Sequence, residues 1–197
     1  WNGTSDTETL LEAISFFGLD KTLKLIRGMF SFSLFDKKNQ NIFLVRDRIG
    51  EKPLYLLKLN DHFFAFASEL SAFYKIDEFD PSFNKDAMSC YFKRGWIAAP
   101  LSIWNNISKV LPGNIVNLQI NKNGNYFVKE TIKYWDCFSV SVENQNNKFK
   151  GSFDQSIKKL EELLFEVLEG QSLSDVPLGV FLSGGVDSSL ITALLQK

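Results

Sequence analysis

Hydrophobic and polar residues alternate at helical spacing in the first stretch of the chain. Apolar positions three and four residues apart follow Ser5 and stop before Gly18, which predicts one helix; these positions are Leu10, Leu11, Ile14 and Phe17. Residues 5–8 have the Ser-x-x-Glu form of a capping box at the start of this helix. A second, shorter helix is expected over residues 23–27 and is ended by Gly28.

Four short segments then carry the pattern of β-strands, at residues 30–35, 42–46, 54–58 and 62–67. In the first of them bulky side chains alternate with mostly small ones, so one face of that strand would pack closely against another layer. Charged residues are concentrated at 46–53, between the second and third strands. Strands that follow one another in hairpins predict antiparallel sheets and therefore the α+β class.

The middle of the chain repeats this mixture of helix and strand. Helical patterns are expected at residues 68–74 and 84–94. Two strands, 115–120 and 126–132, then flank the turn at residues 121–125, which has the sequence Asn-Lys-Asn-Gly-Asn. A turn of this composition between apolar runs is the strongest hairpin signal in the sequence.

A polar segment at residues 139–152, rich in Asn and Lys, is predicted to be a linker between a domain at 1–138 and a domain at 153–197. Beyond the linker, one apolar stripe indicates a helix of about four turns; its residues are Phe153, Ile157, Leu160, Leu164, Val167 and Leu168. This helix is expected to pack on a sheet that begins with a buried strand at 177–182. The second domain would thus be of the α/β class.

A Ser-Gly-Gly turn at residues 183–185 interrupts the expected strand, and a further helix is expected from Ser188. The first amides of a helix have no partners within it, and the helix dipole adds partial positive charge, so such a loop is suited to a phosphate or pyrophosphate. Gly184 and Gly185 would let the backbone approach the anion closely, and the hydroxyls of Ser183, Ser188 and Ser189 could add donors. The loop is not a Walker A sequence, because no Gly-Lys-Ser/Thr follows it.

Asp187 is the unusual residue of this loop. A carboxylate among phosphate donors repels phosphate unless a cation lies between them, so Asp187 is expected to hold a Mg²⁺ ion that bridges to phosphate oxygens. The alternative is an ordinary serine-rich helix start, in which Asp187 interacts favourably with the helix dipole.

Composition narrows the function classes. The chain has 197 residues, of which 45% are hydrophobic and 14% aromatic, so it can form a packed core. Its 22 basic and 23 acidic residues nearly balance, without a long basic run, which disfavours a nucleic acid or an anionic membrane as partner. Its two cysteines lack Cys-x-x-Cys spacing, as is typical of a protein in the reducing cytoplasm without a zinc site. No stretch is long and apolar enough for a membrane span. The chain opens at Trp1 and closes shortly after the loop, so both ends are expected to be cut.

Four segments in this order resemble the glutamine-hydrolysing asparagine synthetases: residues 3–8, 28–32, 46–55 and the loop at 183–189, which is also similar to the signature of the ATP pyrophosphatases. The run at 107–113 and Tyr134-Trp135 strengthen the resemblance, which covers essentially the whole chain. It implies an amidotransferase domain of the N-terminal-nucleophile type, a sandwich of two antiparallel sheets between helix layers that is incomplete at its N-terminus here. The start of an α/β ATP pyrophosphatase domain would follow.

The resemblance also implies a reaction. Glutamine is hydrolysed by an N-terminal cysteine, and ammonia crosses to the second domain. There ATP has converted aspartate to a β-aspartyl-adenylate with release of pyrophosphate, and ammonia displaces AMP to give asparagine. Glutamine, aspartate, ATP and Mg²⁺ would be the small-molecule partners, and a homodimer is compatible with the family.

Family residues can be carried over at two places. Asp6 matches the aspartate that holds the α-ammonium of bound glutamine. Taken alone, its position favours a first-turn acid placed for the helix dipole, and the family match reverses that interpretation. The ATP-binding residues would be Leu182, Ser183, Gly184, Gly185, Asp187 and Ser188, with Asp187 the Mg²⁺-pyrophosphate ligand. No catalytic residue is expected in this fragment, because the nucleophilic cysteine lies upstream, so the fragment alone is expected to be inactive. Arg46, Asp47 and Arg48 are interpreted as a structural network, and Cys90 as an ordinary thiol.

Two alternatives share the same motifs. A related amidotransferase could aminate a carboxylate on a sugar or an antibiotic precursor, since the acceptor pocket would lie beyond Lys197. A non-catalytic relative could use the amidotransferase half only for binding, and the identity of the upstream nucleophile would distinguish it from an enzyme.

Overall fold

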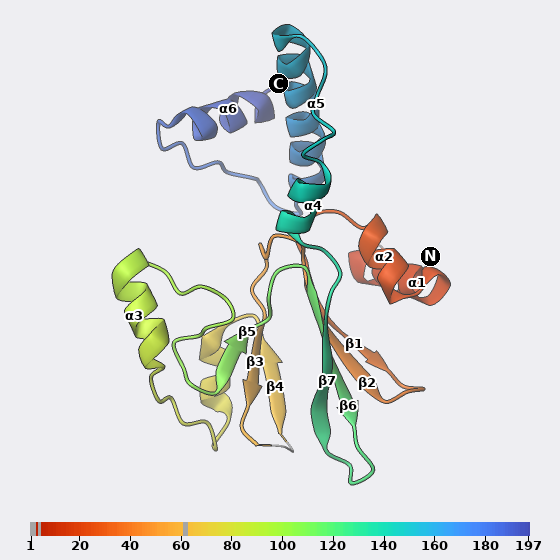
Figure 1. Ribbon diagram of the computed structural model, residues 1–197, viewed down its shortest axis with the longest axis vertical. Coiled ribbons are helices and arrows are strands. Elements are labelled where there is room, and N and C mark those ends of the chain that lie inside the picture. Colours follow the sequence, from red (N-terminus) through yellow and green to blue (C-terminus); the bar gives the residue numbers. More distant parts are fainter. Residues whose placement is uncertain (1–2, 4, 61–62) are drawn as a thin grey trace. The chain divides into compact units, whose positions relative to one another are not determined.

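The computed structural model describes residue 3, residues 5–60 and residues 63–197, and it divides into two compact units, Trp1–Ser139 and Val140–Lys197 (Figure 1). The first unit holds two antiparallel sheets, one with strand order β1-β2-β6-β7 and one with order β4-β3-β5. Antiparallel sheets flanked by helices confirm the α+β class expected for this part of the chain. Its elements in chain order are α1 (Asp6–Phe17), α2 (Leu19–Leu25), β1 (Ser31–Asp36), β2 (Asn41–Arg46), β3 (Tyr55–Lys58), β4 (Phe64–Ala67), the 3₁₀ helix η1 (Leu70–Lys75), α3 (Lys85–Arg94), β5 (Ile107–Lys109), β6 (Asn114–Ile120) and β7 (Tyr126–Lys133). Helix α4 (Cys137–Glu143) spans the limit between the two units.

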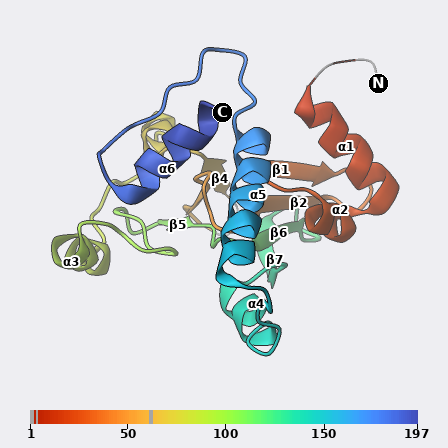
Figure 2. The same ribbon diagram turned by 90° about the horizontal axis from the view of Figure 1, so that it is seen from above.

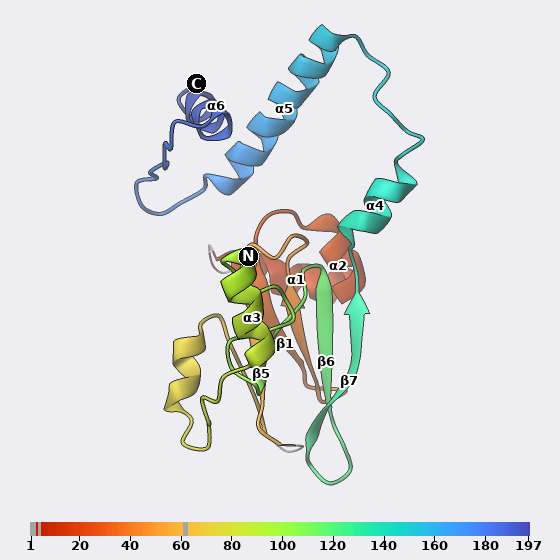
Figure 3. The same ribbon diagram turned by 60° about the vertical axis from the view of Figure 1, so that its left-hand side comes forward.

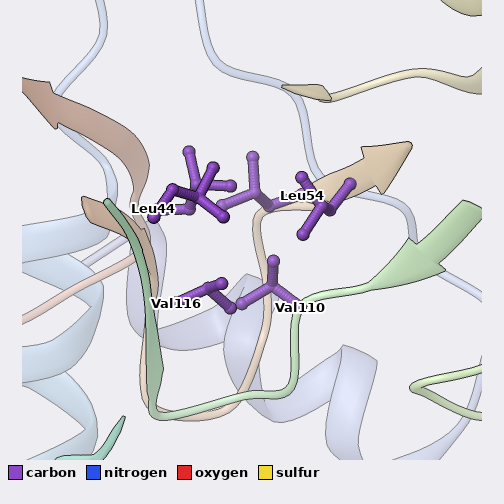
Figure 4. Close-up of a cluster of buried hydrophobic side chains, with 6 residues drawn as sticks. Leu44, Leu54, Val110 and Val116 are labelled. Carbon is purple, nitrogen blue, oxygen red and sulfur yellow. The ribbon is translucent and has the colours of Figure 1, made fainter. Parts of the chain in front are cut away.

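The two sheets face each other across an apolar core (Figure 4). Leu44 and Val116 from the larger sheet meet Leu54 and Val110, which flank strands of the smaller one; Leu56 and Leu118 complete the cluster, and all six side chains are buried. Burying one such aliphatic side chain stabilises the fold by roughly 1.5–3 kcal/mol, so this cluster is a main source of cohesion between the sheets.

Helices cover the outer face of each sheet, which gives four layers (Figure 2). On the larger sheet, Leu23 of α2 packs against Val45 and Ile115. On the smaller sheet, Leu57 packs against Phe73 of η1 and Phe79. This unit therefore has two antiparallel sheets with helices packed against their outer faces, and the N-terminal-nucleophile type of fold stays a prediction.

Several elements lie where the sequence pattern placed them. The β6–β7 hairpin closes through residues 121–125 as expected, with Asn121 accepting two amide hydrogen bonds through its side chain. Asn84 caps α3 by accepting from the Ala87 amide at 3.0 Å. Helix α1 begins after Ser5, whose hydroxyl caps it by accepting from the Thr7 amide. The hydrogen bond that the Glu8 carboxylate accepts from the Gly3 amide, at 2.7 Å, differs from that of a capping box, in which the Ser5 amide would be the donor.

Three expectations for this unit need correction. Strands β2 and β3 do not form a hairpin, because residues 47–54 carry the chain from one sheet to the other. Strand β3 pairs instead with β4 and with β5, a strand too short to be detected from its pattern. The helical pattern at 68–74 forms a 3₁₀ helix, and α2 ends at Leu25. His62, expected at the start of the fourth strand, lies outside the described residues.

The charged crossover at 46–53 is held by hydrogen bonds to the backbone. The Asp47 side chain, 1% exposed, accepts from four amides, those of Phe30, Gly50, Glu51 and Lys52, at 2.6–3.3 Å. The Arg46 guanidinium donates to the carbonyls of Lys52, Val110 and Gly50 at 2.7–2.8 Å. Both charges thus fix backbone positions, in agreement with their interpretation as a structural network.

Two further side chains complete this network. The Arg48 guanidinium donates to the carbonyls of Leu23, Lys24 and Ile26 at the end of α2, where a cation is favoured by the helix dipole. The Tyr134 hydroxyl donates to the Arg46 carbonyl at 2.8 Å. Burial raises the pKa of Tyr134 to about 12, so this hydroxyl stays a proton donor throughout the physiological range.

Gly113 joins the crossover to the end of β7. It has φ +65°, and a β-carbon there would overlap the carbonyl group of Trp135. Replacing Gly113 by Ala is therefore expected to lower the free energy of unfolding by about 2–3 kcal/mol, measured from the urea midpoint. Gly124→Ala is the matched control, because Gly124 also has positive φ (+82°) but no atom lies within 4 Å of the added carbon. Equal losses in the two variants would contradict the steric explanation.

The second unit is built on two helices, α5 (Phe153–Gln171) and α6 (Val186–Leu195) (Figure 3). Helix α5 begins where the apolar stripe predicted, and a capping box of Ser152 and Gln155 starts it, a signal that sequence inspection missed. Helix α4 (Cys137–Glu143) extends into the expected linker at 139–152, so residues 139–143 of that linker are helical. The domain limits 1–138 and 153–197 stay predictions.

The prediction of a buried strand at 177–182 is wrong. These residues are neither strand nor helix, and they are exposed; Phe181 is 99% and Leu182 61% exposed. A strand needs a neighbour for its amides and carbonyls. Among the described residues of the second unit no other strand supplies one, so an apolar run alone does not form a sheet here.

Candidate functional site

The loop before α6 has the geometry of an open helix N-terminus. Gly185 is the N-cap residue, and within the described chain no side chain forms a capping hydrogen bond to the first amides of α6. Gly184 has φ +80°, a conformation that glycine adopts without strain, and nothing lies within 4 Å of where its side chain would be. The helix begins at Val186, two residues earlier than expected, which places Asp187 and Ser188 in its first turn.

Two loop hydroxyls converge at this end of the helix. Ser183 Oγ and Ser188 Oγ are 3.0 Å apart, and Ser188 Oγ also donates to the Gly185 carbonyl at 3.2 Å. Ser183, Gly184, Gly185 and Asp187 are exposed, and Ser188 is half-buried. Free amides, hydroxyls and helix dipole together make a site that can accept a phosphate-type anion. Leu182 precedes the loop with an exposed side chain, so only its backbone is suited to line a nucleotide there.

The residues of the loop fit a magnesium ion only if phosphate supplies further ligands. Across the described residues no group of three or more His, Cys, Asp or Glu side chains could hold a metal by itself. Mg²⁺ is commonly bound through one or two carboxylates, substrate phosphates and water. Asp187, exposed in the first turn of α6, can supply one such carboxylate.

Asp6 lies in the other unit, as the first residue of α1. The hydroxyls of Ser5 and Thr7 donate to its Oδ1 atom, both at 3.4 Å. These are long hydrogen bonds, and the side chain is exposed, so the carboxylate can accept a stronger donor such as an ammonium group.

A cavity of about 550 Å³ opens beside Asp6. It lies between α1, the segment leading into β1, and the end of the crossover. Its volume is within the range of small-molecule sites. Its walls combine one carboxylate, two basic residues, hydroxyls and apolar side chains; they are Asp6, Thr7, Thr9, Leu10, Ala13, Ile26, Arg27, Met29, Phe30, Ser31, Phe32 and Lys52.

Sequence inspection missed the basic residues of this cavity. Arg27 follows α2 and Lys52 lies near the end of the charged crossover. Tertiary packing brings both of them to the walls of the cavity that Asp6 also lines. Lys52 was part of the motif at 46–55, but its separation from Asp6 in the chain gave no sign of proximity. Asp47 fixes this wall, because its carboxylate binds the amides of both Phe30 and Lys52, at 3.3 and 2.9 Å.

The remaining candidates lie apart from these sites. Cys90 is half-buried and its thiol donates to the Trp96 carbonyl at 3.4 Å, and both cysteines are free thiols. In the part of the chain that the structure describes, no helix combines the length and apolar character needed to cross a membrane.

Two different family models match the two halves of the chain. Residues 1–135 match the model of the glutamine amidotransferase domain, and residues 159–197 match the model of asparagine synthase. The two matches occur in the chain order that the sequence motifs predicted.

Curated relatives resemble the chain over nearly its full length. Asparagine synthetases (glutamine-hydrolyzing) 1 and 3 of Bacillus subtilis are 29% and 31% identical over 100% and 97% of this chain, which spans 29% of each. The human asparagine synthetase (glutamine-hydrolyzing) is 28% identical over 98% of this chain, which covers 31% of it. The chain thus spans about three-tenths of the length of these relatives.

Proposed function

The chain belongs to the glutamine amidotransferase family, and from that membership we propose that it is part of an enzyme that amidates aspartate to asparagine with glutamine and ATP. The observation that carries the proposal is the presence, in one polypeptide, of the amidotransferase fold and an open Ser-Gly-Gly loop at the start of α6. The first would supply ammonia, and the second would bind the nucleotide that activates the acceptor.

In the amidotransferase half, the cavity beside Asp6 binds glutamine. Its amino-acid end carries an ammonium and a carboxylate, and the cavity offers groups of both signs, with Asp6 for the ammonium. Hydrolysis of the side-chain amide by water gives glutamate and ammonia. The nucleophile implied by the family is an N-terminal cysteine, so the 197-residue chain alone is proposed to lack glutaminase activity.

In the synthetase half, the loop at residues 182–188 binds ATP. A carboxylate oxygen of aspartate attacks the α-phosphorus, and pyrophosphate leaves as the bond to the bridging oxygen breaks. The amides at the start of α6 and the Ser183 and Ser188 hydroxyls stabilise the charge that develops on the leaving group. Asp187 would hold Mg²⁺, which neutralises phosphate charge when bound. Ammonia then attacks the acyl carbon of the β-aspartyl-adenylate and AMP leaves.

The setting follows from this chemistry. ATP, aspartate and glutamine are cytoplasmic metabolites, and we infer a cytoplasmic enzyme of amino-acid biosynthesis. A homodimer is proposed from the family resemblance alone.

Pyrophosphate release by the full-length protein tests the proposal. With Mg²⁺-ATP and glutamine, release should depend on aspartate and should be accompanied by equal amounts of AMP and asparagine. A panel of other carboxylates, including sugar acids, forms the comparison. Release that depends on one of them and not on aspartate would overturn asparagine synthesis in favour of a related amidotransferase, and no release with any acceptor would favour a binding role.

Replacing Asp6 by Asn is expected to raise KM for glutamine by about 10–100-fold, because a neutral amide loses the charge-assisted contact with the α-ammonium. Synthesis supported by added ammonia should be unchanged, since it bypasses glutamine. Asp20→Asn is the matched control, because Asp20 is also a first-turn acid, in α2. If both variants leave KM unaltered and only weaken the helix start, Asp6 is a structural residue.

A further inference from the structure

The helix-facing side of the larger sheet carries a polar cluster that the proposed function does not use. In β2 and β6, Val45 pairs with Ile115 and Phe43 with Asn117. Paired residues share a face and every second residue returns to it, so Asn41 and Asn117 lie on the face that Val45 and Ile115 present to α2. Glu130 of β7 pairs with Asn117 and shares this face.

Both asparagines are buried, with 7% of Asn41 and 3% of Asn117 exposed. Their Oδ1 atoms receive no hydrogen bond from any residue that the structure describes. Buried acceptors without a donor are rare in folded proteins, since water has been lost and nothing replaces it. Two of them lie on adjacent strands and on the same face, two residue pairs apart along the ladder, and this diagonal arrangement indicates a shared binding partner.

Glu130 sets the orientation of the Asn117 amide. The Nδ2 atom of Asn117 donates to Glu130 Oε1 at 3.2 Å, and a flipped amide would instead place two acceptors together. Because oxygen and nitrogen occupy opposite edges of the amide, Oδ1 is on the edge that does not bind Glu130, and β2 is the neighbour of β6 on the side opposite β7. The strand that carries Asn41 is β2.

A β-bulge adjoins the same position. Asn117 pairs with Glu130 and Leu118 with Val128, so Lys129 has no counterpart on β6. A bulge leaves a residue out of the ladder and redirects nearby side chains, and such irregularities concentrate at sites with a role. The bulge therefore favours a binding site at this position over a packing defect.

We propose that Asn41, Asn117 and Glu130 bind a monovalent cation of the sodium or potassium class on this face. The unsatisfied atoms are both acceptors, and the one amide donor identified beside them is already used on Glu130. Amide and carboxylate oxygens are ligands for hard cations. A single carboxylate carries too little charge for a typical divalent site, in which several acidic groups contribute.

Thermal unfolding of the purified protein in 100 mM potassium, sodium or choline chloride tests this site, because choline matches the ionic strength but cannot enter a small oxygen cage. Potassium or sodium should raise Tm by about 3–5 °C in a saturable manner. Asn117→Leu should abolish the cation-dependent shift, and the exposed, isosteric Glu130→Gln should reduce it by half or more. Glu12→Gln on exposed α1 should leave it intact.

Equal Tm values in choline and in both metal chlorides would overturn the proposal, as would a full shift in Glu130→Gln. Crystals soaked in a thallium salt give the direct comparison. An anomalous peak beside Asn117 Oδ1 supports a cation, and an ordered water without anomalous signal there overturns it in favour of a buried water.

Discussion

Replacing Asp187 by Asn in the full-length protein is expected to lower aspartate-dependent pyrophosphate release by about 10²–10³-fold, while glutamate release from glutamine stays near the original rate. The loss of one group that stabilises charge in a transition state commonly has an effect of this size. Asp187 is exposed in the first turn of α6, beside the free amides and the Ser183–Ser188 hydroxyl pair. Its carboxylate would otherwise repel phosphate, so the role proposed for it is to hold a cation between the two.

Asp175→Asn is the matched control for Asp187→Asn, because Asp175 is an exposed acid in the segment that leads into the loop. It should leave both rates near their original values. An Asp187 variant with normal pyrophosphate release and a less stable α6 would contradict the nucleotide role. Such a result would instead favour the reading of Asp187 as an acid placed for the helix dipole.

Sequence pattern succeeded where an element is determined by its own residues. The β6–β7 hairpin is set by Asn121, which binds two amides within its own turn, and α3 by Asn84, which caps it three residues away. The motif at 183–189 was recognised for the same reason, since its glycines and hydroxyls act locally. In each case the hydrogen bonds that define the element join residues no more than five positions apart.

Pattern failed where distant parts of the chain decide the structure. The crossover at 46–53 resembles a hairpin connection, but Asp47 binds the amide of Phe30, 17 residues earlier, and Arg46 binds the carbonyl of Val110, 64 residues later. The run at 177–182 has the composition of a strand, yet a strand forms only beside another strand. The cavity beside Asp6 was missed for the same reason, since Lys52 reaches it only through that crossover.

Replacing Asp47 by Ala is expected to destabilise the first unit by about 3–5 kcal/mol and to lower its Tm by about 10 °C or more. The substitution removes the acceptor for four backbone amides at once, and the side chain that supplies it is 1% exposed. Because water does not reach this position freely, the amides stay without partners or the crossover rearranges. Differential scanning calorimetry on the purified protein measures the change.

Asp36→Ala is the control that tests whether the loss of Tm in Asp47→Ala comes from burial of the carboxylate or only from the number of hydrogen bonds removed. The Asp36 carboxylate also accepts several, from the Lys38 and Asn39 amides and the Asn39 side chain at 2.7–3.1 Å, but within a solvent-facing turn. Water can replace Asp36 there, so a much smaller change in Tm is expected. Similar losses of Tm in the two variants would mean that the crossover is not fixed by Asp47.

If only the Asp47 variant loses stability, the wall of the Asp6 cavity that contains Lys52 should be displaced when the Asp47 hydrogen bonds are lost. The KM for glutamine should then rise in Asp47→Asn, even at temperatures where that variant remains folded.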